Sequence, residues 1–143
     1  MDAAATALQP LESLADDLVS SCRSVSWYGY RLLVLLREFD LRNGYREVRG
    51  KGRCAADSAE WLDARCGIGR ETVRDKLRVG YALLNLPEIE SAFEAGELTF
   101  AKVRALVEVA TLDSEGALLD FARAMTDAQV VEYCRRLRTG TLA

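Results

Sequence analysis

The chain has 143 residues, of which half are apolar and 29% are charged, and its formal net charge is -3. This length and composition are typical of one folded domain that needs no disulfide or metal. Since the chain is acidic overall, any site for nucleic acid has to be a local basic patch. No apolar run reaches the length of a membrane span, and the acidic N-terminus does not resemble a signal peptide, so we expect a cytoplasmic protein.

The residue types argue against several kinds of active site. The chain has no histidine, which excludes Ser-His-Asp and Cys-His nucleophilic sites and histidine-ligated metals. Its carboxylates are scattered along helical patterns, and no Cys-x-x-Cys pair indicates zinc. We therefore expect no enzyme activity, no cofactor and no metal. Cys66 and Cys134 are expected in the core, while Cys54 is expected to be exposed in a loop.

Helical spacing predicts two helices before residue 45. In segment 1–24, Pro10 opens an amphipathic helix that runs to about Ser21. Segment 25–44 is the most apolar part of the chain, and we place its helix at the centre of the core or in a dimer interface. Aromatic residues at this spacing favour core packing over a base-stacking platform. The apolar face of this second helix consists of Trp27, Tyr28, Leu32, Leu35, Leu36 and Phe39.

Segment 45–56 is irregular, rich in glycine and the only concentrated basic stretch. Flexible basic loops can hold the DNA backbone by releasing counterions, and they can equally be solvated connectors. The cations that we assign to phosphate contacts are Arg46, Arg49, Lys51 and Arg53.

Segment 57–86 predicts two helices joined by a tight turn. Asp57 is expected to cap the first helix, whose Leu62 and Cys66 face inward. Gly67 supplies a left-handed turn, which we expect Ile68 to fill. A second helix then follows, with Gly69 as its N-cap and Val73 on its inner face.

This arrangement is that of a helix-turn-helix, whose second helix enters the DNA major groove. Asp63 stands where a small residue is usual, and Lys76 where an apolar one is usual. Glu71 and Asp75 on the exposed face oppose phosphate binding, so an αα-hairpin that only packs is the competing interpretation. The predicted DNA contacts on the second helix are Arg70, Thr72, Arg74 and Arg78.

Segment 87–143 predicts further helices, delimited by recognisable start and stop residues. Pro87 opens a helix and Thr99 caps the next one. Thr126 and Gln129 form a capping box, and Gly140 ends the last helix. No alternating strand pattern occurs. The sequence thus predicts an all-α, single-domain helical bundle of seven or eight helices that contains a helix-turn-helix-like pair.

The run SAEWLDARCGIGRETVRDKLRVGYALLNLPEIESAFEAGELTFAKVRALVEVA resembles the bacterial domain of unknown function 222. That module is found in the N-terminal part of HNH endonuclease proteins of the 13E12-repeat type, and the resemblance covers roughly Val25 to Leu137. The same stretch is similar to the helix-turn-helix of ParB-type partition proteins. HNH chemistry needs histidines that this chain lacks, so the resemblance implies a module that precedes a nuclease domain and not the nuclease itself.

These observations favour a non-catalytic module that binds double-stranded DNA in an HNH-endonuclease-associated protein. The alternative is a dimerisation or protein-protein interaction module that docks a nuclease or another partner without touching DNA. In that case the apolar helix from Val25 to Leu41, or the C-terminal helix, joins two copies or holds the partner. A homodimer is compatible with both interpretations, since two copies bring two recognition helices to palindromic half-sites.

Overall fold

The structure is a computed structural model that describes residues 2–48 and 55–141. Within these residues it is all-α and contains no strand, which confirms the predicted fold class. It has nine α-helices in this part of the chain, where seven or eight were predicted. The difference arises because two short helices were missed and two predicted helices are continuous.

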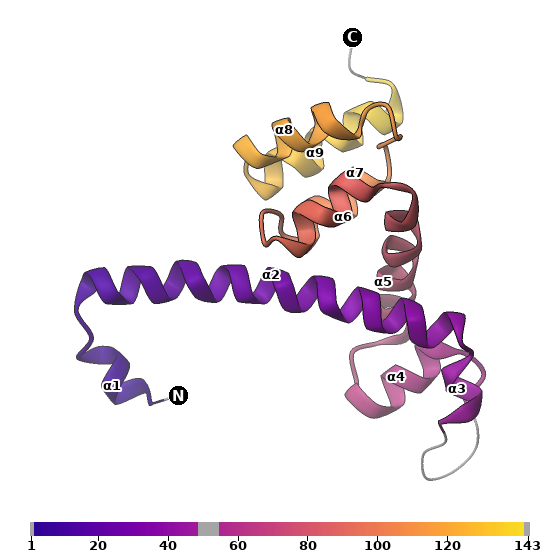
Figure 1. Ribbon diagram of the computed structural model, residues 1–143, viewed down its shortest axis with the longest axis horizontal. Coiled ribbons are helices and arrows are strands. Elements are labelled where there is room, and N and C mark those ends of the chain that lie inside the picture. Colours follow the sequence, from indigo (N-terminus) through magenta and orange to yellow (C-terminus); the bar gives the residue numbers. More distant parts are fainter. Residues whose placement is uncertain (1, 49–54, 142–143) are drawn as a thin grey trace.

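The elements follow one another along the chain as Figure 1 shows. They are α1 (Ala3–Ala7), α2 (Leu11–Leu41), α3 (Gly44–Glu47), α4 (Ser58–Cys66), α5 (Arg70–Ala82), the 3-10 turn η1 (Leu83–Asn85), α6 (Pro87–Glu94), α7 (Phe100–Val107), α8 (Glu115–Ala124) and α9 (Asp127–Thr139).

The long helix α2 replaces the two N-terminal helices that the sequence predicted. The predicted break after Ser21 was wrong, because serine lowers helix propensity only slightly and no proline interrupts α2. With 31 residues, the helix is about 46 Å long at 1.5 Å per residue. Gly29 does not break it either; a Cβ there would lie 3.5 Å from the Phe93 ring, so α6 packs closely at this point.

The other helices pack on the C-terminal part of α2 (Figure 1). The helices α6 and α7 lie along one side of α2, and α8 and α9 form an outer layer beyond them. On the other side of α2 lie α3 and α4, and α5 passes α2 to connect the two sides. The N-terminal part of α2 extends past this body, with α1 at its end.

The main core lies between α2, α5 and the four C-terminal helices, and it is built from aliphatic side chains around the fully buried Phe93. Glu115 is also buried there, and its Oε1 accepts a hydrogen bond of 2.7 Å from the amide of Ile89. This contact supplies a cap for the first turn of α6, because the N-cap residue Leu86 has no side chain that can accept a hydrogen bond.

The apolar face of α2 is only partly used in this core. Leu33 is buried in this core and Leu36 in a second, smaller cluster, but Trp27, Tyr28 and Leu35 are exposed. Their predicted place in the core was therefore wrong, because the inward face of α2 is rotated away from them. The other alternative for this face, an interface between two copies, stays open.

Candidate nucleic-acid interface

The helices α4 and α5 form the predicted pair with a tight turn. The Asp57 carboxylate accepts a hydrogen bond of 2.8 Å from the amide of Glu60, so α4 begins at Ser58 as expected. Gly67 ends α4 with φ of 67°, and Gly69 has φ of 93°. Both values lie in the region that favours glycine, which is why the chain can reverse within three residues.

Asp63 explains one departure from the usual helix-turn-helix pattern. Its Oδ1 accepts a hydrogen bond of 2.8 Å from the amide of Gly69, across the turn. A small residue at this position could not make that bond. The carboxylate therefore fixes the entry of α5 relative to α4, and it also lies 3.9 Å from Nε of Arg70.

A small second core holds the pair together and against α2. It consists of the buried Leu36, Ala59 and Val73, with Leu62 and Leu77 packed around them. Leu77 thus supplies the contact that Lys76 cannot, and the Lys76 ammonium lies 3.9 Å from the centre of the Phe100 ring.

Two predicted inward positions of the pair were wrong. Cys66 is exposed and Ile68 is 39% exposed, whereas Cys134 is buried as expected. The tight turn carries Cys66 and Ile68 past the edge of the small core, so their side chains reach solvent.

Three of the predicted DNA contacts lie in the first half of α5 and are exposed. The side chains of Arg70 and Arg74 are 54% and 55% exposed, and Thr72 is exposed as well. The Asp57 carboxylate lies 3.7 Å from the Arg74 guanidinium. Since the ion pairs of Arg70 and Arg74 are long and open to water, both guanidinium groups can exchange their carboxylate for a phosphate at small cost.

Arg78 lies in a different environment. Its guanidinium is 2.7 Å from Asp75 and 2.5 Å from Glu108, and Arg104 binds the other oxygen of Asp75 at 2.6 Å. The hydrogen bond that Arg78 donates to Asp75, together with the charge of Glu108, raises the pKa of Arg78 against the effect of burial. Arg78 therefore binds the C-terminal end of α7. Arg70 and Arg74 instead pair with carboxylates of α4 and of its N-cap.

Of the predicted phosphate contacts in segment 45–56, Arg46 lies within the described residues. Arg46 lies on α3, is exposed and stacks 5.4 Å from the centre of the Tyr45 ring. The predicted contacts Arg49, Lys51 and Arg53 lie outside the described residues. The segment leaves α3 beside α4, because the Trp61 indole donates a hydrogen bond of 2.6 Å to the carbonyl of Val48.

A polar anchor that the sequence analysis missed joins the pair to α2. One oxygen of Asp40 accepts a hydrogen bond of 2.7 Å from the buried Ser58, and the other accepts one from the Tyr81 hydroxyl. Burial and the Asp40 carboxylate raise the pKa of Tyr81 to about 12. The signal was present in the sequence, because Asp40 continues the inward spacing of Leu33 and Leu36.

A second anchor holds α5 to α2 one turn earlier along α2. Arg37 donates a hydrogen bond of 2.7 Å to the carbonyl of Gly80 and pairs with Glu90 at 3.0 Å. A Cβ on Gly80 would lie 3.4 Å from the carbonyl oxygen of Leu33, so the two helix backbones come close. Together the two anchors fix the direction of α5 relative to the body.

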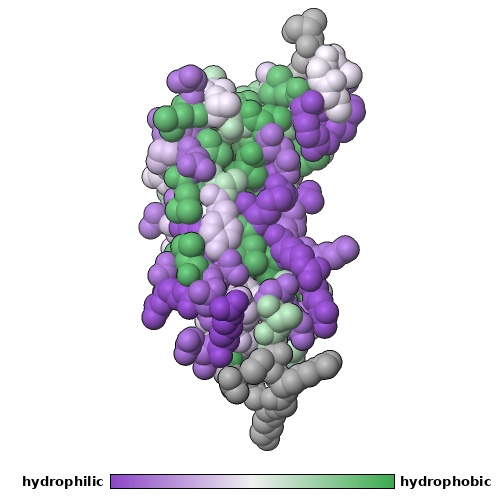
Figure 2. Space-filling model, turned by 90° about the vertical axis from the view of Figure 1, so that its right-hand side faces the viewer, coloured by the Kyte–Doolittle hydropathy of each residue, from purple (hydrophilic) through white to green (hydrophobic). Residues whose placement is uncertain are grey.

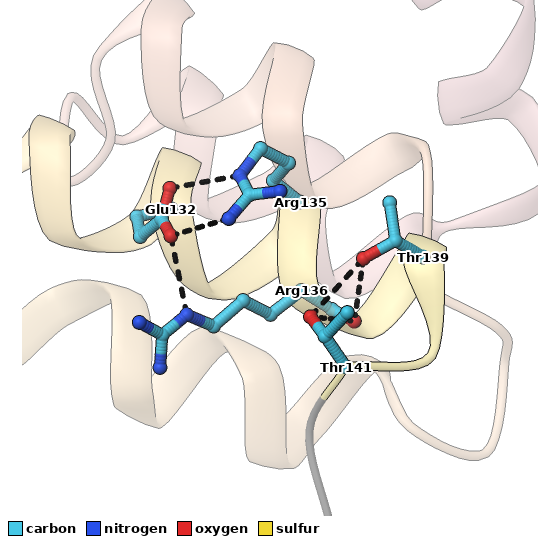
Figure 3. Close-up of polar contacts among 5 residues, drawn as sticks. All are labelled: Glu132, Arg135, Arg136, Thr139 and Thr141. Atoms are coloured by element: carbon cyan, nitrogen blue, oxygen red, sulfur yellow. Dashed lines mark hydrogen bonds and ion pairs between the residues drawn. The ribbon is translucent and has the colours of Figure 1, made fainter.

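Another charged cluster lies on α9 (Figure 3), which is separated from α4 by α2 and α7 in Figure 1. Glu132 there accepts hydrogen bonds from Arg135 and Arg136 at 2.7 to 3.1 Å, and these bonds lower its pKa to about 2. The arginines of α9 are thus exposed cations of the same type as those of α5, at a different place in the molecule.

Figure 2 looks onto the end of the molecule where α3 and α5 lie in Figure 1. Hydrophilic side chains cover the right-hand side and the lower left of this face, and apolar ones lie mainly in its left-hand, central and upper parts. Chemically, α5 offers guanidinium groups at spacings of four residues, with Glu71 as an acidic residue in its first turn. Such a face can bind an anionic partner weakly, and its guanidinium groups can donate to base edges.

No family model, curated protein or solved structure matches this chain. Among residues 2–48 and 55–141, no three His, Cys, Asp or Glu side chains come together as a metal site would need. In the same residues, no helix is both long and apolar enough to cross a membrane.

Proposed function

We propose that this chain binds double-stranded DNA through α5, as a non-catalytic module of an HNH-endonuclease-associated protein. The observation that carries the proposal is the exposed first half of α5, where Arg70 and Arg74 stand on one side of a helix that follows a tight turn. In a helix-turn-helix, it is the N-terminal part of the second helix that contacts base edges.

The anchors to α2 support this proposal. A helix that reads DNA has to be held rigidly, so that its side chains reach the groove in one orientation. The Asp40 contacts to Ser58 and Tyr81, and the Arg37 contact to Gly80, hold α4 and α5 from the inner side. Arg70 and Arg74 lie beside α4 in the first half of α5, and their guanidinium groups stay exposed there.

The local charge balance sets the expected strength of binding. Asp57, Asp63 and Glu71 lie near the two exposed arginines and repel phosphates. We therefore expect weak binding at physiological salt and a clear increase at low salt. The basic segment with Arg46, and with Arg49, Lys51 and Arg53, supplies the remaining phosphate contacts in this proposal.

The test is fluorescence anisotropy of a labelled mixed-sequence duplex, titrated with the protein at several salt concentrations. The test variant is Arg70→Ala/Arg74→Ala. We expect it to weaken binding, and to reduce the slope of log K against log salt by about two if each arginine contacts one phosphate. Arg78 is left intact, because its replacement also removes the contacts to Asp75 and Glu108.

The matched control is Arg135→Ala/Arg136→Ala on α9, which removes the same charge from an equally exposed surface (Figure 3). If both double variants weaken binding equally, the effect comes from net charge and α5 has no special part in it. If the wild-type chain does not bind even at the lowest salt, DNA binding by this module is refuted.

A further inference from the structure

One side of α2, next to the side that faces the core, carries an apolar stripe that is largely exposed. Leu14 and Leu32 are half-buried, and Leu18 borders a pocket with residues 96–99. Its residues recur at alternating steps of three and four from Leu11 to Leu35, and only Ser21 interrupts them. This spacing is that of helices that pair side by side in coiled coils. Leu18, Val25, Tyr28 and Leu35 are 65%, 72%, 67% and 51% exposed.

The stripe is too long to be a set of scattered surface residues. It covers more than three heptads, and about half of it lies on the part of α2 that extends past the body (Figure 1). A contiguous apolar surface of this kind marks an interaction site. A straight helical stripe is best covered by another helix of the same length and spacing, which a second copy of α2 provides.

The charges beside the stripe select the orientation of that second copy. Asp17 and Arg31 are both exposed and flank the stripe on the same edge, fourteen residues apart. If two copies of α2 run antiparallel, so that Leu11 packs on the partner's Leu35, Asp17 lies opposite the partner's Arg31. By the two-fold symmetry this ion pair forms twice. In the single chain Asp17 accepts a hydrogen bond of 2.6 Å from Gln9, a neutral and exposed group that leaves its charge uncompensated.

A parallel pair lacks this complementarity. In that arrangement Asp17 faces the partner's Cys22, and Arg31 faces the partner's Leu36, so neither charge meets an opposite one. The antiparallel arrangement also stacks Leu14 on the partner's Leu32 and Leu18 on the partner's Tyr28. Every apolar residue of the stripe from Leu11 to Leu35 is then covered.

We propose that the chain forms an antiparallel homodimer through the α2 stripe, with Asp17 of each copy paired to the partner's Arg31. This proposal goes beyond DNA binding, because it concerns α2 and its test does not depend on whether α5 binds DNA. The test is sedimentation velocity of the full chain over a wide concentration range, on the wild type and on Asp17→Arg, Arg31→Asp and an equimolar mixture of the two.

We expect each single reversal to place like charges opposite each other at two sites and to raise the dimer Kd about tenfold. In the mixture, the arginine introduced at position 17 of one variant meets the aspartate introduced at position 31 of the other. The unchanged Arg31 of the first variant likewise meets the unchanged Asp17 of the second, so the heterodimer recovers the wild-type affinity. Asp16→Arg is the matched control, since it makes the same charge change on the opposite side of α2 and leaves the Kd unchanged.

A further variant, Leu18→Asp, is expected to abolish the dimer while the helical circular dichroism stays the same, because Leu18 is already exposed in the single chain. A wild-type chain that stays monomeric at every concentration overturns the proposal. A dimer that is indifferent to the single reversals, or that mixing does not restore, overturns the antiparallel arrangement.

Discussion

Gly44 lies so close to the Phe39 ring that no larger residue fits there. A Cβ at this position would overlap two carbons of the Phe39 ring. The ring in turn packs on Trp61, with centroids 4.4 Å apart, and so helps to hold α4. We expect Gly44→Ala to lower the free energy of unfolding by about 1 to 3 kcal/mol, because the ring has to move out of a packed position.

Urea denaturation followed by circular dichroism measures this effect. The matched control is Gly116→Ala in the first turn of α8, where the nearest atom to the new Cβ is the end of the Glu88 side chain at 3.5 Å. That control should be neutral or slightly stabilising, since alanine is the better helix former. If both variants lose the same stability, crowding against Phe39 is not the cause.

The raised pKa of Tyr81 predicts how the stability of the fold changes at alkaline pH. Its pKa is raised to about 12 by burial and by Asp40, from about 10 in an unfolded chain. A folded pKa above the unfolded one means that the contribution is complete below about pH 10 and is lost as the pH rises towards 12. We expect Tyr81→Phe to remove this part of the alkaline decline in melting temperature.

The comparison variant for Tyr81 is Tyr133→Phe on α9, which removes a hydroxyl away from Asp40. Melting curves of the three proteins at several alkaline pH values separate the effects. Should Tyr81→Phe decline with pH as steeply as the wild type, the phenol is not what couples α5 to α2.

At the scale of residues, the helix caps could be predicted from the sequence, whereas the contacts between distant helices could not. The caps by Asp57, Thr99 and Thr126 were recognised because a capping side chain bonds to an amide only three residues away. The contacts of Asp40 and of Glu115 escaped, because their partners lie 18 or more residues away along the chain. Spacing marks Asp40 as an inward-facing residue, but it does not identify the partner of Asp40 before the fold is known.

At the scale of elements, the turn between α4 and α5 depends on Asp63. Removing its hydrogen bond to the amide of Gly69 leaves that amide without its partner, which typically costs about 1 to 2 kcal/mol. We expect Asp63→Ala to destabilise the α4-α5 pair and to speed amide hydrogen exchange at Gly69. Asp63→Asn keeps an oxygen that can accept the bond, so most of the protection should return.

Exchange measured by NMR distinguishes these outcomes residue by residue. Equal exchange at Gly69 in the alanine and asparagine variants would show that the charge near Arg70 matters and the hydrogen bond does not. The sequence showed that Asp63 departs from the usual motif. The structure explains this departure by the hydrogen bond from the amide of Gly69.

The length of α2 was the main error at this scale. Serines near residue 21 looked like a boundary, but a helix that already packs along its C-terminal half continues unless a proline or a strong capping signal stops it. The heptad spacing across residues 11–35 was visible in the sequence all along. It was divided between two expected helices, so its continuity was lost.

At the scale of the whole molecule, α5 is the element that joins both halves of the fold. Its inner face contacts α2 through Gly80, and its outer face contacts α7 through Asp75 and Arg78. Length and composition predicted a single domain. Helical spacing and the lack of an alternating strand pattern predicted the all-α class, which was confirmed for the described residues. The orientation of α5 was not predictable, because it depends on ion pairs between helices that are far apart in the chain.

The ion pairs of Asp75 predict how the stability of the whole fold changes at acid pH. Burial raises the pKa of Asp75, but hydrogen bonds from Arg104 and Arg78 lower it more, so the net pKa is below its usual value. A lowered folded pKa contributes stability that is complete above about pH 4 and is lost as the pH falls through the folded pKa. We expect Asp75→Asn to lower the melting temperature near neutral pH and to lose this difference from the wild type in strong acid. Asp120→Asn, whose side chain is 82% exposed, is the matched control and should change little at any pH. A deficit of Asp75→Asn that persists unchanged in acid would assign the loss to packing between α5 and α7, since the charge of Asp75 no longer contributes there.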